Sequence, residues 1–428
     1  MKKKYATYIF NIKTIYFLAL LSCLLLIIKY GNLWGYDTNS YIKAWDNISS
    51  GKIDIWRTPV YPIILGISKW CFGVDKYLYV LTIIQHFVFL ISIHYFHKIS
   101  LFLNVSTNIS LFLTAIYALF PCVAIWNCYN QTEALAIYSM IFLLYCTLKT
   151  YNNYPIFILL SYSFWLLFQT LLRPSQIYII PTYLVFWLFI YIFQKEKSKI
   201  ALLGIVSTSI VCSILIIYIY SFKKEYGILS PSGVEVLNRY YIARRDGLLN
   251  VDNTNNIHLK RFIIEKEKEF ENKNGTVTDL FEEAELAINT FGLYQISEIT
   301  SNCYKSSYKN TIRTFIQRIH NSSNENFMFT YNNNISAISD IIGLKLNILF
   351  YLFSFFPLYY IFIRKQKNSF SVFTFLLYTI GILQLIISLL FCQNEWGILI
   401  MPSISIYLLL FGQLSKDLQI NFNKVLLQ

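Results

Sequence analysis

The loop that follows the first apolar stretch carries the residues with the clearest chemical potential. Asp37 lies shortly after that stretch ends, and Arg57 opens the segment Arg57-Thr58-Pro59-Val60-Tyr61-Pro62. A carboxylate that neighbouring helices partly desolvate can act as a general base. A guanidinium on a proline-stiffened turn presents a fork of donors that suits a phosphate. Together the two residue types predict a site that removes a proton and binds an anion.

Both residues also have a purely structural interpretation. The run Asp37-Thr38-Asn39-Ser40 is typical of a helix start, so Asp37 is equally suited to cap a helix. Arg57 directly follows Trp56, and this combination is common where a chain anchors to lipid headgroups. The residue types alone leave both interpretations open.

Three further charged residues stand at the edges of apolar stretches. Glu133 opens one stretch, Arg173 lies in a turn before Pro174, and Glu395 precedes the last stretch. An acid at a membrane boundary is costly unless it is paired or in contact with water, so we expect Glu133 to line the site or to pair with Arg173. Glu133 also fits the first turn of a helix, and Glu395 also fits an interfacial position.

Long apolar stretches must position these residues. Of the 428 residues 56% are hydrophobic and only 14% are charged, which is too apolar for a soluble domain of this size. Stretches of roughly 20 apolar residues, the length that spans a bilayer as a helix, recur along the chain and predict an all-α polytopic membrane protein with about ten transmembrane helices. The expected spans are 10–29, 77–97, 109–127, 132–149, 155–172, 176–193, 200–221, 345–363, 370–391 and 397–414.

The short basic loops predict the orientation of the chain. The lysines at 2–4 and the basic segments 195–199 and 364–367 fall on one side if the spans alternate, and the positive-inside rule makes that side the cytoplasm. The N-terminus is then cytoplasmic, and the active face of a multi-pass protein of the inner (plasma) membrane points outward.

This topology predicts three parts of the chain. Residues 1–221 form an N-terminal transmembrane module, which includes the first outward, catalytic loop 30–76. Residues 222–344 form a small, mainly helical outward domain, and residues 345–428 form a C-terminal transmembrane module. The short apolar stretch from Pro59 to Phe72 is expected to lie in the membrane interface or to re-enter it.

Composition excludes several other classes of protein. The net charge of +13 is spread along the chain without a basic stripe or a reader motif, so no nucleic acid partner is expected. The eight cysteines lie mostly in or beside apolar stretches, with no CxxC pair and no Cys/His cluster at metal spacing. The sequence therefore predicts neither a disulfide framework nor a metal site.

The spacing in the first loop resembles that of the membrane-embedded GT-C glycosyltransferases, particularly bacterial proteins of family 39 and those like dolichyl-phosphate-mannose-protein mannosyltransferase. Such proteins open with an acid after the first span, then a tyrosine, an alanine, a glycine and Arg-x-Pro-x-Tyr-Pro. Weaker matches follow at Pro121, Glu133, the turn 171–174 and the segment 284–288. The matching positions of the first loop are Asp37, Tyr41, Ala44, Gly51, Arg57, Pro59, Tyr61 and Pro62.

The resemblance implies a GT-C-like enzyme that transfers a sugar from a polyprenyl-phosphate donor to a glycan, lipid or protein acceptor on the outer face, with inversion. It implies that Asp37 is the catalytic base and that Arg57 and Arg173 bind the donor phosphate. Some enzymes of this class use a divalent cation such as Mg²⁺ or Mn²⁺, but the sequence offers no set of ligands for one. The implied substrate-binding residues are Tyr41, Tyr61, Glu133 and Glu395.

The resemblance is incomplete, and two other functions stay open. Relatives often carry an arginine or tyrosine just before the last span, where this chain has Asn394-Glu395-Trp396-Gly397, so the exact donor is in doubt. An enzyme of envelope polysaccharide assembly similar to O-antigen polymerases would also have many spans and a large outward loop. A non-enzymatic flippase or transporter of lipid-linked glycans would be expected to carry charges deep inside its spans or paired broken helices.

Overall fold

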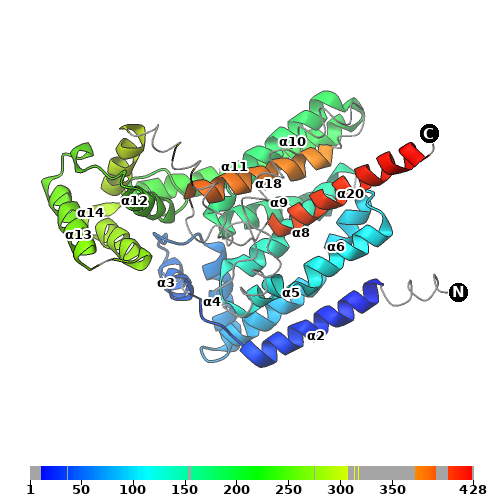
Figure 1. Cartoon of the computed structure of the whole chain (residues 1–428), viewed down its shortest axis with the longest axis horizontal. Helices are drawn as coiled ribbons and strands as arrows, with labels where there is room; N and C mark the ends of the chain where they lie inside the picture. Colours follow the sequence, from blue (N-terminus) through cyan, green and yellow to red (C-terminus); the bar gives the residue numbers. More distant parts are fainter. Residues whose placement is uncertain are drawn as a thin grey trace.

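The structure is a computed structural model of the chain and is almost entirely helical. It describes residues 11–35, 37–152, 156–273, 275–306, 372–391 and 403–426, together with positions 313 and 317. Within these ranges the isolated β contact is a single bridge between Leu33 and Tyr129. Long helices run side by side through most of the molecule, whereas α12, α13 and α14 gather at the end opposite to the C-terminal end of α20 (Figure 1).

Within the described residues, five helical stretches are long and apolar enough to cross a membrane, and five apolar helices are shorter. The chain is therefore a helical membrane protein, while the number of about ten spans stays a prediction. The expected span 345–363 lies outside the described residues. The long stretches are α2 (Ile12–Tyr30), α5 (Tyr77–Phe102), α8 (Thr132–Tyr151), Pro174–Phe193 with η2 (Pro174–Gln176) and α10 (Ile179–Phe193), and Lys195–Tyr226 with η3 (Lys195–Lys197) and α11 (Ser198–Tyr226). The shorter apolar helices are α4 (Val60–Phe72), α6 (Thr107–Leu119), α9 (Ile156–Leu172) and parts of α18 (Val372–Phe391) and α20 (Ile404–Leu426).

One predicted span is wrong, because the stretch 109–127 is not a single helix. The helix α6 ends at Leu119, and the chain continues through α7 (Pro121–Ala124) and the 3-10 helix η1 (Ile125–Cys128). Proline has no backbone N–H to donate within a helix, but it fits the first turn of a new one, so Pro121 divides the stretch. The side chain of Gln85 caps this break by donating to the Asn127 carbonyl oxygen at 2.9 Å.

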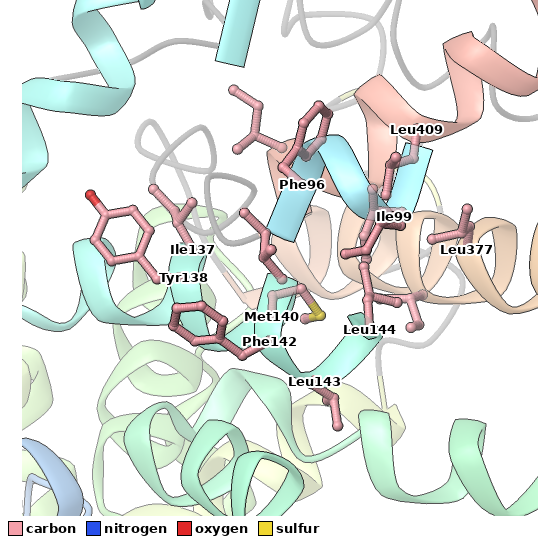
Figure 2. Packing of buried hydrophobic residues seen from close by; sticks show 14 of the residues in the cluster. Phe96, Ile99, Ile137, Tyr138, Met140, Phe142, Leu143, Leu144, Leu377 and Leu409 are labelled. Atoms are coloured by element: carbon pink, nitrogen blue, oxygen red, sulfur yellow. The ribbon is translucent and has the colours of Figure 1, made fainter. Parts of the chain in front are cut away.

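The helix α8 forms the centre of the membrane part of the molecule. In its most apolar window 78% of the residues are buried, against 17% for α2, so α8 is surrounded by protein and α2 mostly faces outward. Figure 2 shows α8 side chains from Ile137 to Leu144 packed with Phe96 and Ile99 of α5, Leu377 of α18 and Leu409 of α20. Burial of this apolar surface fixes α8, and with it the position of Glu133 at its start.

Three amphipathic helices form a second core outside this bundle. The α12–α14 cluster consists of α12 (Val234–Arg245), α13 (Ile257–Asn272) and α14 (Val277–Ser306), with the 3-10 helix η4 (Val251–Asn253) between the first two. The Glu283 carboxylate is buried in this cluster, where it accepts from the Tyr240 hydroxyl at 2.9 Å and from Arg244 Nε at 3.1 Å. The apolar core of the α12–α14 cluster includes Tyr240, Leu259, Ile263, Ala284, Ala287, Ile288 and Ile296.

The loop after α2 folds into a helical hairpin, α3 (Thr38–Ser49) and α4 (Val60–Phe72). Tyr61 and Leu65 of α4 are buried, whereas Trp70 is 86% exposed, so the short apolar stretch is an amphipathic helix with one face outward. The two helices approach closely because Gly66 has no side chain: a Cβ at this position would overlap the indole ring of Trp45 on α3.

The close approach at Gly66 leads to a first prediction. Gly66→Ala should destabilise the protein by about 1–3 kcal/mol, because the added methyl group must push the Trp45 ring aside. Thermal unfolding of the detergent-solubilised protein would measure the change. The matched control is Gly66→Ala in a Trp45→Ala background, where the same methyl group should cost much less. Equal costs in both backgrounds would contradict close packing of α3 on α4.

Candidate active site

Asp37 and Arg57 form an ion pair at the start of α3. The Asp37 Oδ1 atom lies 2.6 Å from Arg57 Nη2. Asp37 occupies the N-cap position of α3, where the structural interpretation places it, but its side chain makes no capping hydrogen bond. The Asp37 side chain is 46% exposed and that of Arg57 only 15%, so the carboxylate reaches solvent while the guanidinium lies inside.

One face of α3 surrounds the Arg57 guanidinium. Arg57 Nε donates to the Ser40 hydroxyl at 2.7 Å, and Nη1 lies within hydrogen-bonding distance of the Tyr41 hydroxyl at 3.4 Å. The guanidinium carbon also lies 4.4 Å from the centre of the Tyr41 ring, a cation–π distance. Residues 37, 40 and 41 share a face because helical neighbours recur every three or four positions. Arg57 therefore points into the protein and is not a lipid anchor.

The charge of Arg57 is secured by this environment. Burial lowers the pKa of Arg57, but the Asp37 carboxylate and the Tyr41 oxygen outweigh it, and the net pKa is raised. Burial is also the main cause that raises the pKa of Tyr41, so its hydroxyl keeps its proton. The start of α3 thus holds a permanent cation beside a neutral phenol and a half-exposed carboxylate.

A second, deeper ion pair joins α8 to the end of α9. The Arg173 Nη1 atom lies 3.1 Å from Glu133 Oε1, and both side chains are less than a tenth exposed. Arg173 has an extended backbone, φ −138° and ψ 120°, as expected for a residue before proline, and this conformation ends α9 there. The pairing of Glu133 with Arg173, one of the two alternatives from the sequence, is confirmed.

Short contacts connect the two ion pairs. The Tyr41 hydroxyl lies 3.4 Å from the hydroxyl of Thr132, the neighbour of Glu133. The Thr58 hydroxyl, next to Arg57 in the chain, donates to the carbonyl oxygen of Leu172 at 3.3 Å. Helices α3, α4, α8 and α9 therefore meet at one place, above a small apolar cluster. This cluster contains Tyr41, Tyr61, Leu65, Tyr77, Leu81, Leu135, Ala136 and Leu172.

Two polar atoms in this region have unused hydrogen-bonding capacity. The Tyr61 hydroxyl and the Glu133 Oε2 atom are buried without a hydrogen-bond partner in the described part of the chain. The Tyr61 ring meets the Tyr41 ring edge-on at 4.9 Å, which fixes where its hydroxyl lies. Buried polar groups are nearly always hydrogen-bonded, so these two atoms suit contact with a polar ligand.

The sequence found most of this region but missed several supporting residues. Six of the seven expected site residues converge here, and the seventh, Glu395, lies outside the described residues. Ser40, Thr132 and Asp54 were missed. Ser40 stands three positions after Asp37, a spacing that could have indicated it. Asp54 accepts hydrogen bonds from the backbone N–H groups of Trp56 and Arg57. The sequence motifs considered above did not predict these contacts.

The described charged groups of this region pair with one another. Among the described residues no group of three His, Cys, Asp or Glu side chains lies close enough to hold an ion. Asp37 and Glu133 instead face Arg57 and Arg173 as their charged partners. An arginine that contacts a carboxylate occupies the place where a cation would bind.

Two of the solved structures that are similar to this chain are oligosaccharyltransferases, while no protein-family model and no curated protein matches it. One is the archaeal oligosaccharyltransferase AglB from Archaeoglobus fulgidus in complex with an inhibitory peptide and a dolichol-phosphate. Its TM-score is 0.49 at 12% identity, over 96% of this chain and 50% of that one. The other, an oligosaccharyltransferase of the same organism tethered to an acceptor peptide containing the NVT sequon, gives 0.48 at 13%, over 98% and 51%. This chain spans about half the length of those proteins, and at such low identity its function has to be inferred from its own residues.

The buried ion pair leads to a second prediction. Glu133→Gln should destabilise the protein by about 3–5 kcal/mol, because Arg173 would remain buried without a countercharge. Thermal unfolding in detergent would measure the loss. Replacing both partners with apolar residues, Glu133→Leu with Arg173→Met, should recover most of the stability. A Glu133→Gln variant as stable as the wild type would show that the pair is not buried as described.

Proposed function

We propose that this chain is a GT-C-type glycosyltransferase that moves a sugar from a polyprenyl-phosphate donor to an acceptor hydroxyl at the outer face of the plasma membrane. The observation that carries the proposal is the contact between Asp37 and Arg57. It combines a half-exposed carboxylate with a buried, permanently charged guanidinium 2.6 Å away. These are the two groups that the reaction needs, a base for the acceptor and a cation for the departing phosphate.

In the proposed reaction the donor phosphate binds first and takes over the guanidinium of Arg57. This exchange leaves the Asp37 carboxylate free to accept the proton of the acceptor hydroxyl. The acceptor oxygen attacks the anomeric carbon, the bond from that carbon to the phosphate oxygen breaks, and the electron pair leaves with polyprenyl phosphate. Arg57 stabilises the charge that develops on the phosphate, and the single displacement inverts the anomeric centre.

The contacts favour Arg57 over Arg173 as the arginine that meets the phosphate. Arg173 and Glu133 are both deeply buried, so a phosphate that displaced Glu133 would leave an uncompensated charge behind. We assign this pair to holding α8 and α9 together beneath the site. Tyr41 and Tyr61 remain candidates for contact with the donor sugar, because a tyrosine side chain can pack its ring against a sugar and hydrogen-bond it with its hydroxyl.

The distribution of charges supports an outward site and an enzyme over a transporter. Arg173 precedes the helical stretch Pro174–Phe193, and the lysines at 195 and 197 follow its other end, so the site and the basic loop lie at opposite ends of one span. Within the described ranges the four most deeply buried charged residues each lie in a loop, at a helix end or in the α12–α14 cluster. These four are Asp54, Glu133, Arg173 and Glu283.

The role of Asp37 gives a third prediction. Asp37→Asn should lower the rate of sugar transfer by about 10²–10⁴-fold, because the amide keeps a contact to Arg57 but cannot accept a proton. The measurement is release of polyprenyl phosphate by purified full-length protein, supplied with a panel of polyprenyl-phosphate sugars and acceptors.

Asp46→Asn is the matched control for this experiment. It changes an exposed acid on α3 and should leave the rate unaltered. Full activity of Asp37→Asn would rule out Asp37 as the base. Absence of release from every donor by the wild type would contradict the transferase and favour transport.

The geometry around Arg57 gives a fourth prediction. Arg57→Lys keeps the charge but loses the planar fork that contacts Asp37, Ser40 and Tyr41 together. We expect kcat/KM for the donor to fall by about 10–100-fold, with the acceptor KM nearly unchanged. Steady-state kinetics with each substrate varied in turn would test this. An equal rise of both KM values would argue against a phosphate-specific role.

A further inference from the structure

Asp54 is a buried acid in the turn that leads to Arg57, and its whole carboxylate is used for local contacts. The residue is 4% exposed. Oδ1 accepts from the backbone N–H of Trp56 at 2.9 Å and from that of Arg57 at 2.7 Å. Oδ2 accepts from the Asn47 side chain on α3 at 2.8 Å. One side chain therefore ties the backbone of Arg57 to the helix that carries Asp37.

The opposite side of the same turn is fastened to the α12–α14 cluster and its connection. The Tyr226 hydroxyl donates to the Ile53 carbonyl oxygen at 2.6 Å, and the Gly233 N–H donates to the Ile55 carbonyl oxygen at 2.6 Å. A Cβ on Gly233 would lie 2.9 Å from that oxygen, so the contact requires glycine. The side chains of Ile53, Ile55 and Trp56 pack against the apolar core of the cluster.

The turn 53–58 thus has two faces with different partners. Residues 53, 55 and 56 contact the α12–α14 cluster, whereas Asp54 contacts α3. Arg57 belongs to the first ion pair, and Thr58 contacts Leu172, the neighbour of Arg173 in the second. Six consecutive residues join the two cores of the molecule. The direction of the Arg57 side chain depends on the backbone of this turn, and Asp54 is the side chain that holds that backbone.

We propose that Asp54 is a positioning residue, which sets the Arg57 guanidinium for the donor phosphate and links its placement to the α12–α14 cluster. This inference rests on the proposed function. The three hydrogen bonds of the Asp54 carboxylate come from neutral donors. The carboxylate therefore fixes the position of the backbone and does not neutralise Arg57. Asp54 itself contacts no substrate.

The test exchanges the two partners of the side-chain contact. In Asn47→Asp two carboxylates face each other, so this variant loses the contact. In Asp54→Asn the Asn47 amide turns over and its oxygen accepts from the new amide nitrogen, so this variant keeps the contact. The double variant also has it: the new amide oxygen at position 54 accepts the two backbone N–H groups, and the amide nitrogen donates to the new carboxylate at position 47. A displacement of Arg57 by an ångström should lower donor kcat/KM by about 10–100-fold in Asn47→Asp. The double variant should recover to within about threefold of the wild type.

Three readouts separate positioning from simple stabilisation of the fold. The donor KM should rise while the acceptor KM and the thermal midpoint stay near the wild-type values. Tyr226→Phe, which removes the hydrogen bond to Ile53 from outside, should change the donor KM in the same direction by a smaller factor. Asp46→Asn on the exposed side of α3 is the matched control and should change nothing.

Binding of polyprenyl phosphate alone makes the inference testable apart from catalysis. Its dissociation constant should increase in Asn47→Asp and in Arg57→Lys, and the added Asp54→Asn exchange should restore it only for the former. This result without sugar transfer by the wild type would support positioning and contradict the proposed function. Wild-type affinity and kinetics in Asn47→Asp, while Arg57→Lys is impaired, would overturn the inference and leave the function standing. Absence of binding by the wild type would overturn both.

Discussion

Burial of two guanidinium groups at the edge of an apolar helical bundle is the constraint on which the arrangement of this protein depends. A charged group loses several kcal/mol of hydration on burial unless a partner and further hydrogen bonds replace it. Arg57 and Arg173 each stand shortly before a proline in the chain. Neither arginine is paired with an acid that is close to it in sequence. Asp37 comes from the start of α3 and Glu133 from the start of α8. Four helices must therefore meet wherever the two arginines are buried.

Residue types predicted the parts of this arrangement that follow from the free-energy cost of exposing apolar surface or burying a charge. Apolar length indicated most of the helices, and the cost of a buried acid indicated that Glu133 would line a site or pair with Arg173. The different environments of α2 and α8 could not be predicted, because both are apolar all round and only tertiary packing decides which faces lipid. Asp54 was missed because its partners are two backbone N–H groups and an amide, whose positions exist only after the turn has folded. Pro121 was visible in the sequence, and its effect on the third span was underestimated.

The α12–α14 cluster gains a role from its contacts with the turn 53–58. Its own core is closed by the buried Glu283–Arg244 pair, so it is a folded unit and more than a loop between spans. Two backbone carbonyl oxygens of the turn accept hydrogen bonds from Tyr226 and Gly233. A shift of the cluster would therefore act on the backbone next to Arg57.

The two ion pairs differ in exposure, and that difference assigns their roles. Opening an ion pair that reaches solvent costs about 0–1 kcal/mol, whereas separating a buried pair costs about 3–5 kcal/mol. The Asp37 carboxylate is 46% exposed and can exchange its arginine for water and an acceptor when a phosphate arrives. Glu133 and Arg173 are less than a tenth exposed and have no comparable alternative. In the proposed reaction a substrate anion would thus open the Asp37–Arg57 pair and leave the Glu133–Arg173 pair closed, so that the same two residue types would form the reactive centre and its fixed support.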